Sequence, residues 1–191
     1  MNEIKELYER SRVTFSLLLI MLVYFIVLTL NGGSTNTGTL LRFGAFYPPA
    51  IVALGQYYRF ITSIFIHIGL SHIFFNGYAL YIFGPLIERL MGPKKYLLFF
   101  ILTGLGGNLL TFIFNFNSLS AGASGSLFGL FGCFLYLIHR HRELVTDQGR
   151  RSILRLVLVN LVLTLVVPSI SVTAHLGGLI IGYLLSYIFV K

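Results

Sequence analysis

Four polar side chains, Ser124, His175, His72 and Asn76, stand in otherwise apolar stretches of this 191-residue sequence. A serine hydroxyl becomes a useful nucleophile when a base lies within hydrogen-bond reach, and His175 is a candidate base for Ser124. Attack on a carbonyl group creates an oxyanion that needs hydrogen-bond donors. The Ser124 backbone N–H, the His72 ring and the Asn76 amide are candidate donors, since His72 and Asn76 lie four residues apart on one helix face. The pattern favours acyl transfer if the fold brings the four residues together.

The segments around these residues have the composition of membrane helices. Hydrophobic residues make up 56% of the chain and charged residues 10%, against about a quarter charged in soluble proteins. Because a bilayer core needs about 20 apolar residues per helix, the long stretches without charge predict six spans. We expect an all-α membrane protein. Its predicted helices are 13–30, 70–88, 95–115, 123–140, 151–167 and 170–190.

The stretch between the first two predicted helices, about 31–66, is expected to be an interfacial loop. Its apolar part, 43–58, is too short for a span and carries Pro49 and Gly55. These two residues would leave backbone groups without hydrogen bonds in lipid. We therefore expect this segment to lie in the membrane interface.

Basic residues predict the orientation of the chain. With six crossings, 12 of the 14 Lys and Arg residues lie on the side of the termini, and Arg42 and Arg59 lie opposite. The positive-inside rule then predicts a multi-pass protein of the cell membrane with both termini cytoplasmic. The net charge of +8 reflects this topology, so we expect the lipid bilayer and not a nucleic acid as partner. We expect one domain over 1–191.

Position along the predicted helices places the four polar residues at one depth. His72 and Asn76 follow the outer start of helix 70–88, and Ser124 lies in the first turn of helix 123–140. At 1.5 Å per residue, His175 lies about 6 Å into the last helix from the same side. All four are expected in the outer half of the bilayer.

Glycine spacing predicts which helices touch. Gly125 and Gly129 form a small-xxx-small pair beside Ser124, and Gly178 and Gly182 form another. Such pairs let helix backbones approach closely. His175 precedes these last two glycines by three and seven residues and therefore shares their face. We predict that the helix of Ser124 packs on the helix of His175.

The acidic residues narrow the chemistry further. All six map to the cytoplasmic side, namely Glu3, Glu6, Glu9, Glu88, Glu143 and Asp147. Without a carboxylate at the depth of His175, the sequence predicts a Ser–His dyad and not a Ser–His–Asp triad. The same pattern argues against aspartyl proteases, His–Glu zinc proteases and carboxylate-dependent transporters. We expect no metal and no other cofactor.

In order and helix assignment, these motifs resemble those of the rhomboid intramembrane serine proteases. That family carries Gly-x-Ser-Gly at the start of its fourth core helix, His-x-x-Gly-x-x-x-Gly in the sixth and His-x-x-x-x-His-x-x-x-Asn on the second. This chain has the three motifs beginning at Gly122, His175 and His67, respectively. The similarity covers about residues 10–190.

The resemblance implies a rhomboid-like bundle of six transmembrane helices that cleaves single-span membrane proteins near the outer membrane face. It implies Ser124 as nucleophile and His175 as base. It also implies that His72, Asn76 and the Ser124 N–H form the oxyanion hole. Access for the substrate is expected past the fifth helix.

Several further residues receive supporting roles from the same resemblance. Phe128 stands one turn after the serine where many relatives have Tyr, so it can stack on the histidine but cannot donate a hydrogen bond. Tyr58 and Arg59 replace the Trp-Arg pair of the family's first loop. Glu88 matches a family glutamate at the inner end of the second helix and is expected to be structural, as is His67.

Other interpretations remain open on the sequence. Gly-Ala-Ser-Gly alone is also a helix-packing signal, and a lone intramembrane histidine can be a hydrogen-bonded packing residue. A catalytically silent rhomboid relative that binds and escorts membrane proteins would usually lack the Ser or His, and both are present here. A small channel or transporter would need an intramembrane charge or a paired-half hydropathy pattern, and the sequence shows neither. The natural substrate and the oligomeric state stay undetermined.

Overall fold

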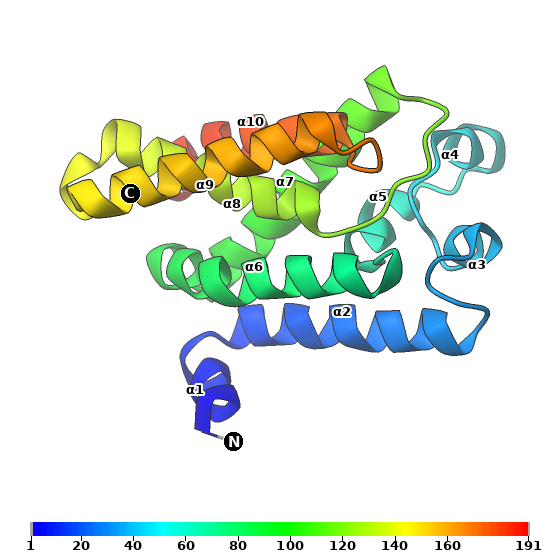
Figure 1. The fold of residues 1–191 in the computed structure, drawn as a ribbon, viewed down its shortest axis with the longest axis horizontal. Helices are drawn as coiled ribbons and strands as arrows, with labels where there is room; N and C mark the ends of the chain where they lie inside the picture. Colours follow the sequence, from blue (N-terminus) through cyan, green and yellow to red (C-terminus); the bar gives the residue numbers. More distant parts are fainter. Residues whose placement is uncertain (1, 191) are drawn as a thin grey trace.

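The computed structural model describes residues 2–190 as a bundle of helices (Figure 1). Over this range the only strand pairing is a single bridge between Phe46 and Ser120. The prediction of an all-α membrane protein is confirmed. The long helices are α2 (Arg12–Leu30), α6 (Gly69–Met91), α7 (Pro93–Phe114), α8 (Ser124–Arg140), α9 (Asp147–Val166) and α10 (Val172–Phe189).

The predicted helix boundaries agree with these to within four residues. The largest difference is at α9, which begins at Asp147 and not at 151. The Thr146 hydroxyl caps this helix by accepting from the Gly149 N–H at 3.1 Å, and Asp147 pairs with Arg150 in the first turn. Hydropathy marks where a helix can enter lipid, whereas the cap decides where the helix starts.

Four of the long helices, α2, α6, α7 and α10, are long and apolar enough to cross a membrane by length and composition. The other two helices do not meet these criteria, because α8 has only 17 residues and α9 begins with a charged segment. Most side chains of α8 are buried among other helices. Protein rather than lipid surrounds α8, so its surface need not match the bilayer.

Shorter elements connect the bundle. The chain starts with α1 (Asn2–Arg10), and a 3-10 turn, η2 (Arg142–Leu144), follows α8. The segment expected to be interfacial contains α3 (Thr37–Arg42), α4 (Pro48–Leu54), α5 (Arg59–Thr62) and the 3-10 turn η1 (Ser63–Phe65). These pieces gather at one end of the bundle, where the start of α6 also lies (Figure 1).

Arg59 holds this loop region together. Its buried guanidinium donates to the backbone oxygens of Ala45 at 2.7 Å and Leu41 at 2.8 Å, and to Gln56 Oε1 at 2.7 Å. The same group lies 5.6 Å from the ring centroid of Tyr58. An aromatic–arginine pair is thus present in the loop although the chain has no Trp.

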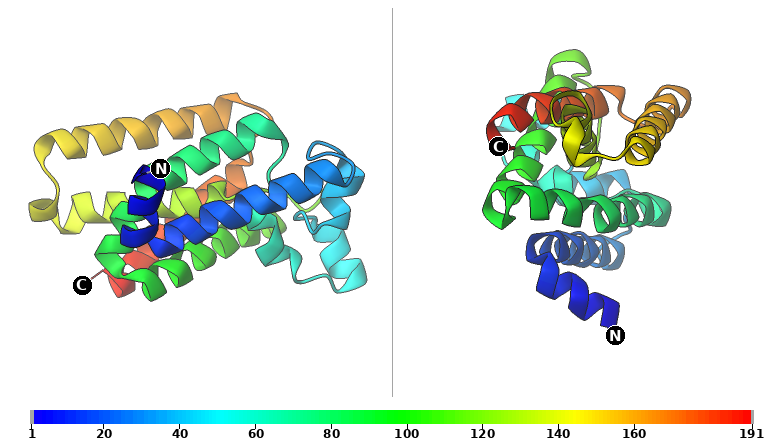
Figure 2. Two further views of the ribbon diagram at one scale, coloured as in Figure 1. Left: turned by 90° about the horizontal axis from the view of Figure 1, so that it is seen from below. Right: turned by 90° about the vertical axis from the view of Figure 1, so that its left-hand side faces the viewer.

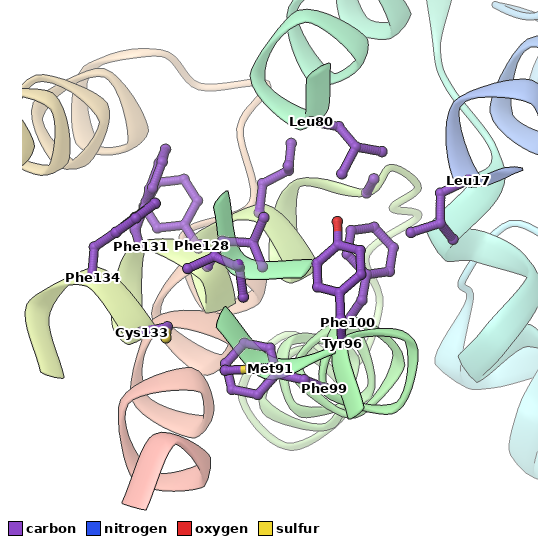
Figure 3. Packing of buried hydrophobic residues seen from close by; sticks show 14 of the residues in the cluster. Leu17, Leu80, Met91, Tyr96, Phe99, Phe100, Phe128, Phe131, Cys133 and Phe134 are labelled. Carbon is purple, nitrogen blue, oxygen red and sulfur yellow. The ribbon is translucent and has the colours of Figure 1, made fainter. Parts of the chain in front are cut away.

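The centre of the bundle is formed by α7, α8 and α10. Figure 3 shows the aromatic side chains of α7 and α8 converging on one core, including Tyr96, Phe99, Phe128 and Phe131. Gly125 and Gly129 of α8 face the glycines of α10, as their spacing predicts. Backbone is in contact with backbone there, which brings the N-terminal turns of α8 and α10 together.

Glu88, near the C-terminal end of α6, fastens α2 to the bundle. Its buried carboxylate accepts from the Val13 N–H at 2.9 Å, the Thr14 N–H at 2.8 Å and the Thr14 hydroxyl at 2.8 Å. The two amides belong to the first turn of α2, where helix N–H groups lack partners within the helix. The negative charge also suits the positive end of the helix dipole.

Replacing Glu88 by glutamine is expected to lower the free energy of unfolding by about 2 kcal/mol, because a hydrogen bond to a charged group contributes about 1.5–3 kcal/mol. An amide keeps only one acceptor oxygen for three donors. Unfolding in detergent micelles measures the change. The control is Glu6→Gln, which removes an exposed ion pair with Arg10 and should cost under about 1 kcal/mol. Equal effects of the two variants would contradict the assignment.

Candidate active site

Ser124 is the first residue of α8 and follows a tight turn. Ala123 is the N-cap residue, and Gly122 has φ 129°, a backbone conformation that favours glycine. A Cβ atom at Gly122 would come within 2.7 Å of His72 Nε2, so only glycine leaves room for that ring. At the first helical position, the Ser124 N–H has no carbonyl partner within α8. The half-buried serine therefore follows a turn that packs on His72, and its amide is available to a ligand.

Two backbone amides of the turn before Ser124 donate hydrogen bonds to the loop region and so fix the turn against it. The Gly122 N–H donates to the Ser63 oxygen at 2.9 Å. The Ala123 N–H donates to His67 Nε2 at 3.4 Å, while His67 Nδ1 lies 3.2 Å from the Phe65 oxygen. Because a carbonyl can only accept, Nδ1 carries the proton and Nε2 is the acceptor.

His67 is accordingly neutral in this fold. Burial lowers its pKa to about 3, and the neighbouring His72, at 5.2 Å between ring centroids, contributes to this lowering. A protonated ring would present an N–H to the Ala123 N–H and break the contact. His67 thus binds the backbone of the turn, and its ring packs edge-on against His72.

His175 lies near the start of α10, where the Ser171 hydroxyl caps the helix by accepting from the Ala174 N–H at 3.2 Å. The buried imidazole stacks on the Phe128 ring, with 4.0 Å between centroids and 20° between planes. Phe128 follows Ser124 by one helical turn. The stacking therefore sets the histidine against the first turns of α8.

The backbones of the same turns touch. A Cβ atom at Gly125 would lie 3.4 Å from the Ala174 oxygen, and one at Gly178 would overlap the Gly125 oxygen. These residues flank Ser124 on α8 and His175 on α10. Further along the same seam, Gly182 faces Gly129 in the same way. The structure thus brings together the turns that carry the candidate nucleophile and base.

His72 and Asn76 project from the N-terminal part of α6. His72 Nδ1 accepts from the Ile68 N–H at 3.4 Å, so the proton is on Nε2, the atom beside Gly122. Asn76 Nδ2 donates one proton to the His72 oxygen at 3.0 Å and has a second proton to offer. His72 can therefore donate toward the turn of Ser124, and Asn76, one helical turn further along α6, has a proton left to donate.

One contact of His175 was not predicted from the sequence. Thr164 of α9 places its Oγ1 atom 2.7 Å from His175 Nδ1. The position along the helices could have indicated this contact. Thr164 lies two residues before the end of α9 and His175 three residues after the start of α10, so both are near the same end of the bundle. Hydropathy gave no indication that this threonine faces inward.

The hydrogen-bond partners of Arg59 and Glu88 do not include the candidate catalytic or oxyanion-hole residues. Arg59 binds the loop backbone, and Glu88 lies 12 residues beyond Asn76 on α6, about 18 Å away along the helix axis. Both act on the scaffold.

Comparisons with known proteins show which family this chain resembles. The rhomboid domain model matches residues 54–191 of the chain. Rhomboid protease GluP of Bacillus subtilis is 36% identical over 178 residues, which are 92% of this chain and 35% of that protein. The Bacillus subtilis protein YdcA is 34% identical over 141 residues, with 73% of this chain and 71% of YdcA covered. Rhomboid-like protease 1 of Toxoplasma gondii is 36% identical over 159 residues, or 80% of this chain and 53% of that protein.

This chain therefore spans about a third of the length of GluP and most of the length of YdcA. The match to the family model covers α6, α8 and α10, the three helices that carry the four polar residues. Together with the membrane helices, the glycine-lined contact and the stacked histidine, this match shows that the chain belongs to the rhomboid family of intramembrane proteases.

Proposed function

We propose that this chain is a serine endopeptidase that cleaves single-span membrane proteins near the outer membrane face with a Ser124–His175 dyad. The observation that carries the proposal is the stacking of His175 on Phe128, one turn after Ser124, across a backbone contact between α8 and α10. A silent, escort-type relative would not need a serine and a histidine on facing turns beside two oxyanion donors.

The reaction follows from the groups in place. Ser124 Oγ attacks the carbonyl carbon of the scissile peptide bond while His175 Nε2 takes its proton. The oxyanion accepts hydrogen bonds from the Ser124 N–H, His72 Nε2–H and Asn76 Nδ2–H. The C–N bond breaks as His175 returns the proton to the leaving amine. A water molecule, losing its proton to His175, then hydrolyses the acyl-enzyme ester and regenerates the serine.

The proposal includes the membrane topology and the substrate class. We propose one domain over 1–191 with both termini cytoplasmic in the cell membrane. The orientation is supported by Arg142, which lies between α8 and α9, and by Arg150 and Arg151 in the first turns of α9. These arginines are at the opposite end of α8 from Ser124. A substrate helix must unwind locally because helical backbone shields its own carbonyl groups. We propose that it arrives past α9, since Val157 and Thr164 are the only buried side chains within that helix, all of which the structure describes.

A fluorophosphonate probe tests the nucleophile. In detergent-solubilised or proteoliposome-embedded protein we expect covalent labelling of the wild type and none of Ser124→Ala or His175→Ala. Ser126→Ala is a matched control, because this buried serine lies two residues further along α8 and should leave labelling unchanged. Labelling that survives in Ser124→Ala would exclude the mechanism, and a wild type that is folded but never labelled would favour the escort alternative.

A further inference from the structure

The buried hydrogen bond between α9 and α10 has a direction that the geometry fixes. Thr164 is 2% exposed and His175 is 7% exposed, and 2.7 Å separates Thr164 Oγ1 from His175 Nδ1. The same Oγ1 lies 2.7 Å from the backbone oxygen of Asn160, one turn earlier on α9. The threonine hydroxyl thus stands between a carbonyl oxygen and an imidazole nitrogen.

A hydroxyl group has one proton, and a carbonyl oxygen can only accept. Both hydrogen bonds can exist together in one arrangement alone, in which Thr164 donates to the Asn160 oxygen and accepts from His175 Nδ1–H. The proton of the neutral imidazole is then on Nδ1. The lone pair is on Nε2, where a base must have it to take the proton of Ser124.

Two contacts therefore determine the state of the histidine. Stacking on Phe128 fixes the plane of the ring, and Thr164 fixes its rotation and its tautomer. When His175 takes a proton during the reaction, Nδ1–H remains the donor to the same oxygen, and the hydrogen bond becomes charge-assisted. The bond is stronger in the transition state than in the ground state, which is the condition for a contribution to kcat.

We propose that Thr164 is a positioning residue that holds His175 in the Nδ1–H tautomer. Its neutral hydroxyl fills the place that a carboxylate has in a Ser–His–Asp triad. This inference rests on the proposed function of Ser124 and His175. It also makes the base dependent on α9, whose contacts with the bundle are few and which lies at its periphery (Figure 2).

The kinetic test compares three variants in cleavage of a membrane-spanning substrate. Thr164→Val keeps the shape but removes the hydroxyl, and we expect kcat to fall about 10-fold with KM within about twofold, since the lost bond is strongest in the transition state. Thr164→Ser keeps the hydroxyl and should remain within about twofold of the wild type in kcat. Thr103→Val is the matched control, because within residues 2–190 the hydroxyl of this buried threonine bonds only the carbonyls of Phe99 and Phe100 on its own helix.

The tautomer is read directly by 15N NMR of histidine-labelled protein, with His175→Ala used to assign the signals. In the Ser124→Ala background, His175 should show a protonated Nδ1 and an unprotonated Nε2, and Thr164→Val should remove this preference. An Nε2–H tautomer in the protein with Thr164 intact would overturn the proposal, as would unchanged kcat in Thr164→Val.

Different results would refute the Ser124–His175 dyad and the positioning role of Thr164. Cleavage that persists in Ser124→Ala would refute the proposed function while the NMR experiment still decides the hydrogen bond. Because that experiment reads the protein with its own Thr164, it gives a result even if Thr164→Val does not fold.

Discussion

Alanine at Ser124 is expected to reduce kcat for cleavage of a membrane-spanning substrate by at least about 10³-fold, the scale seen when a member of a serine–histidine pair is removed. His175→Ala should cause a loss of the same size. Because the two side chains act in one step, the double variant should be no slower than either single variant. Additive losses would mean that the two residues act independently and that the dyad is wrong.

The control for this experiment is already within α8. Ser126 is fully buried, and within residues 2–190 its Oγ has no hydrogen-bond partner. Ser126→Ala should leave kcat within about twofold of the wild type. The comparison separates the loss of a nucleophile from the general effect of removing a buried hydroxyl near the site.

Alanine at Gly178 is expected to destabilise the protein by about 3 kcal/mol, at the upper end of the cost of overpacking a core. Its Cβ would overlap the Gly125 oxygen, a backbone atom that no rotamer change can move. Relief requires α8 and α10 to separate, which would also draw His175 away from the turn of Ser124. We therefore expect lower kcat in the folded fraction as well as a lower unfolding midpoint in micelles.

Gly77→Ala is the matched control. A Cβ atom at this helical glycine of α6 would lie 3.8 Å from its nearest neighbour, a methyl carbon of Leu18, so the added methyl group fits. Alanine is a better helix former than glycine by about 1 kcal/mol, and the variant should be neutral or more stable. Equal destabilisation of the two variants would show that the close contact of α8 with α10 has no special energetic role.

Hydropathy and charge predicted much of the scaffold. The six long helices begin and end within four residues of the predicted positions, because a long apolar segment that crosses lipid as a single strand of chain satisfies its backbone hydrogen bonds by forming a helix. The short helices of the loop region were not predicted individually. They depend on local caps, such as the Asn36 side chain accepting from the Thr39 N–H at 3.0 Å, and on the guanidinium of Arg59.

The candidate site was predictable where residue spacing carried the information. Glycines four apart identify a helix face, so the contact of α8 with α10 followed from the sequence. Thr164 was not predictable in this way. Asn160 and Thr164 both interrupt an apolar helix, and the pattern of α9 does not say which of its sides meets the bundle.

By itself, the sequence determined where the carboxylates and the glycine faces lie along the helices, and it predicts a common depth for the four polar residues. The tertiary structure decided what each histidine nitrogen does: His67 accepts from the turn of Ser124, and His175 turns its Nδ1 to Thr164. The physical reason is that hydropathy fixes position along the membrane normal. Rotation about a helix axis, and with it the choice of hydrogen-bond partner, depends on packing against other helices.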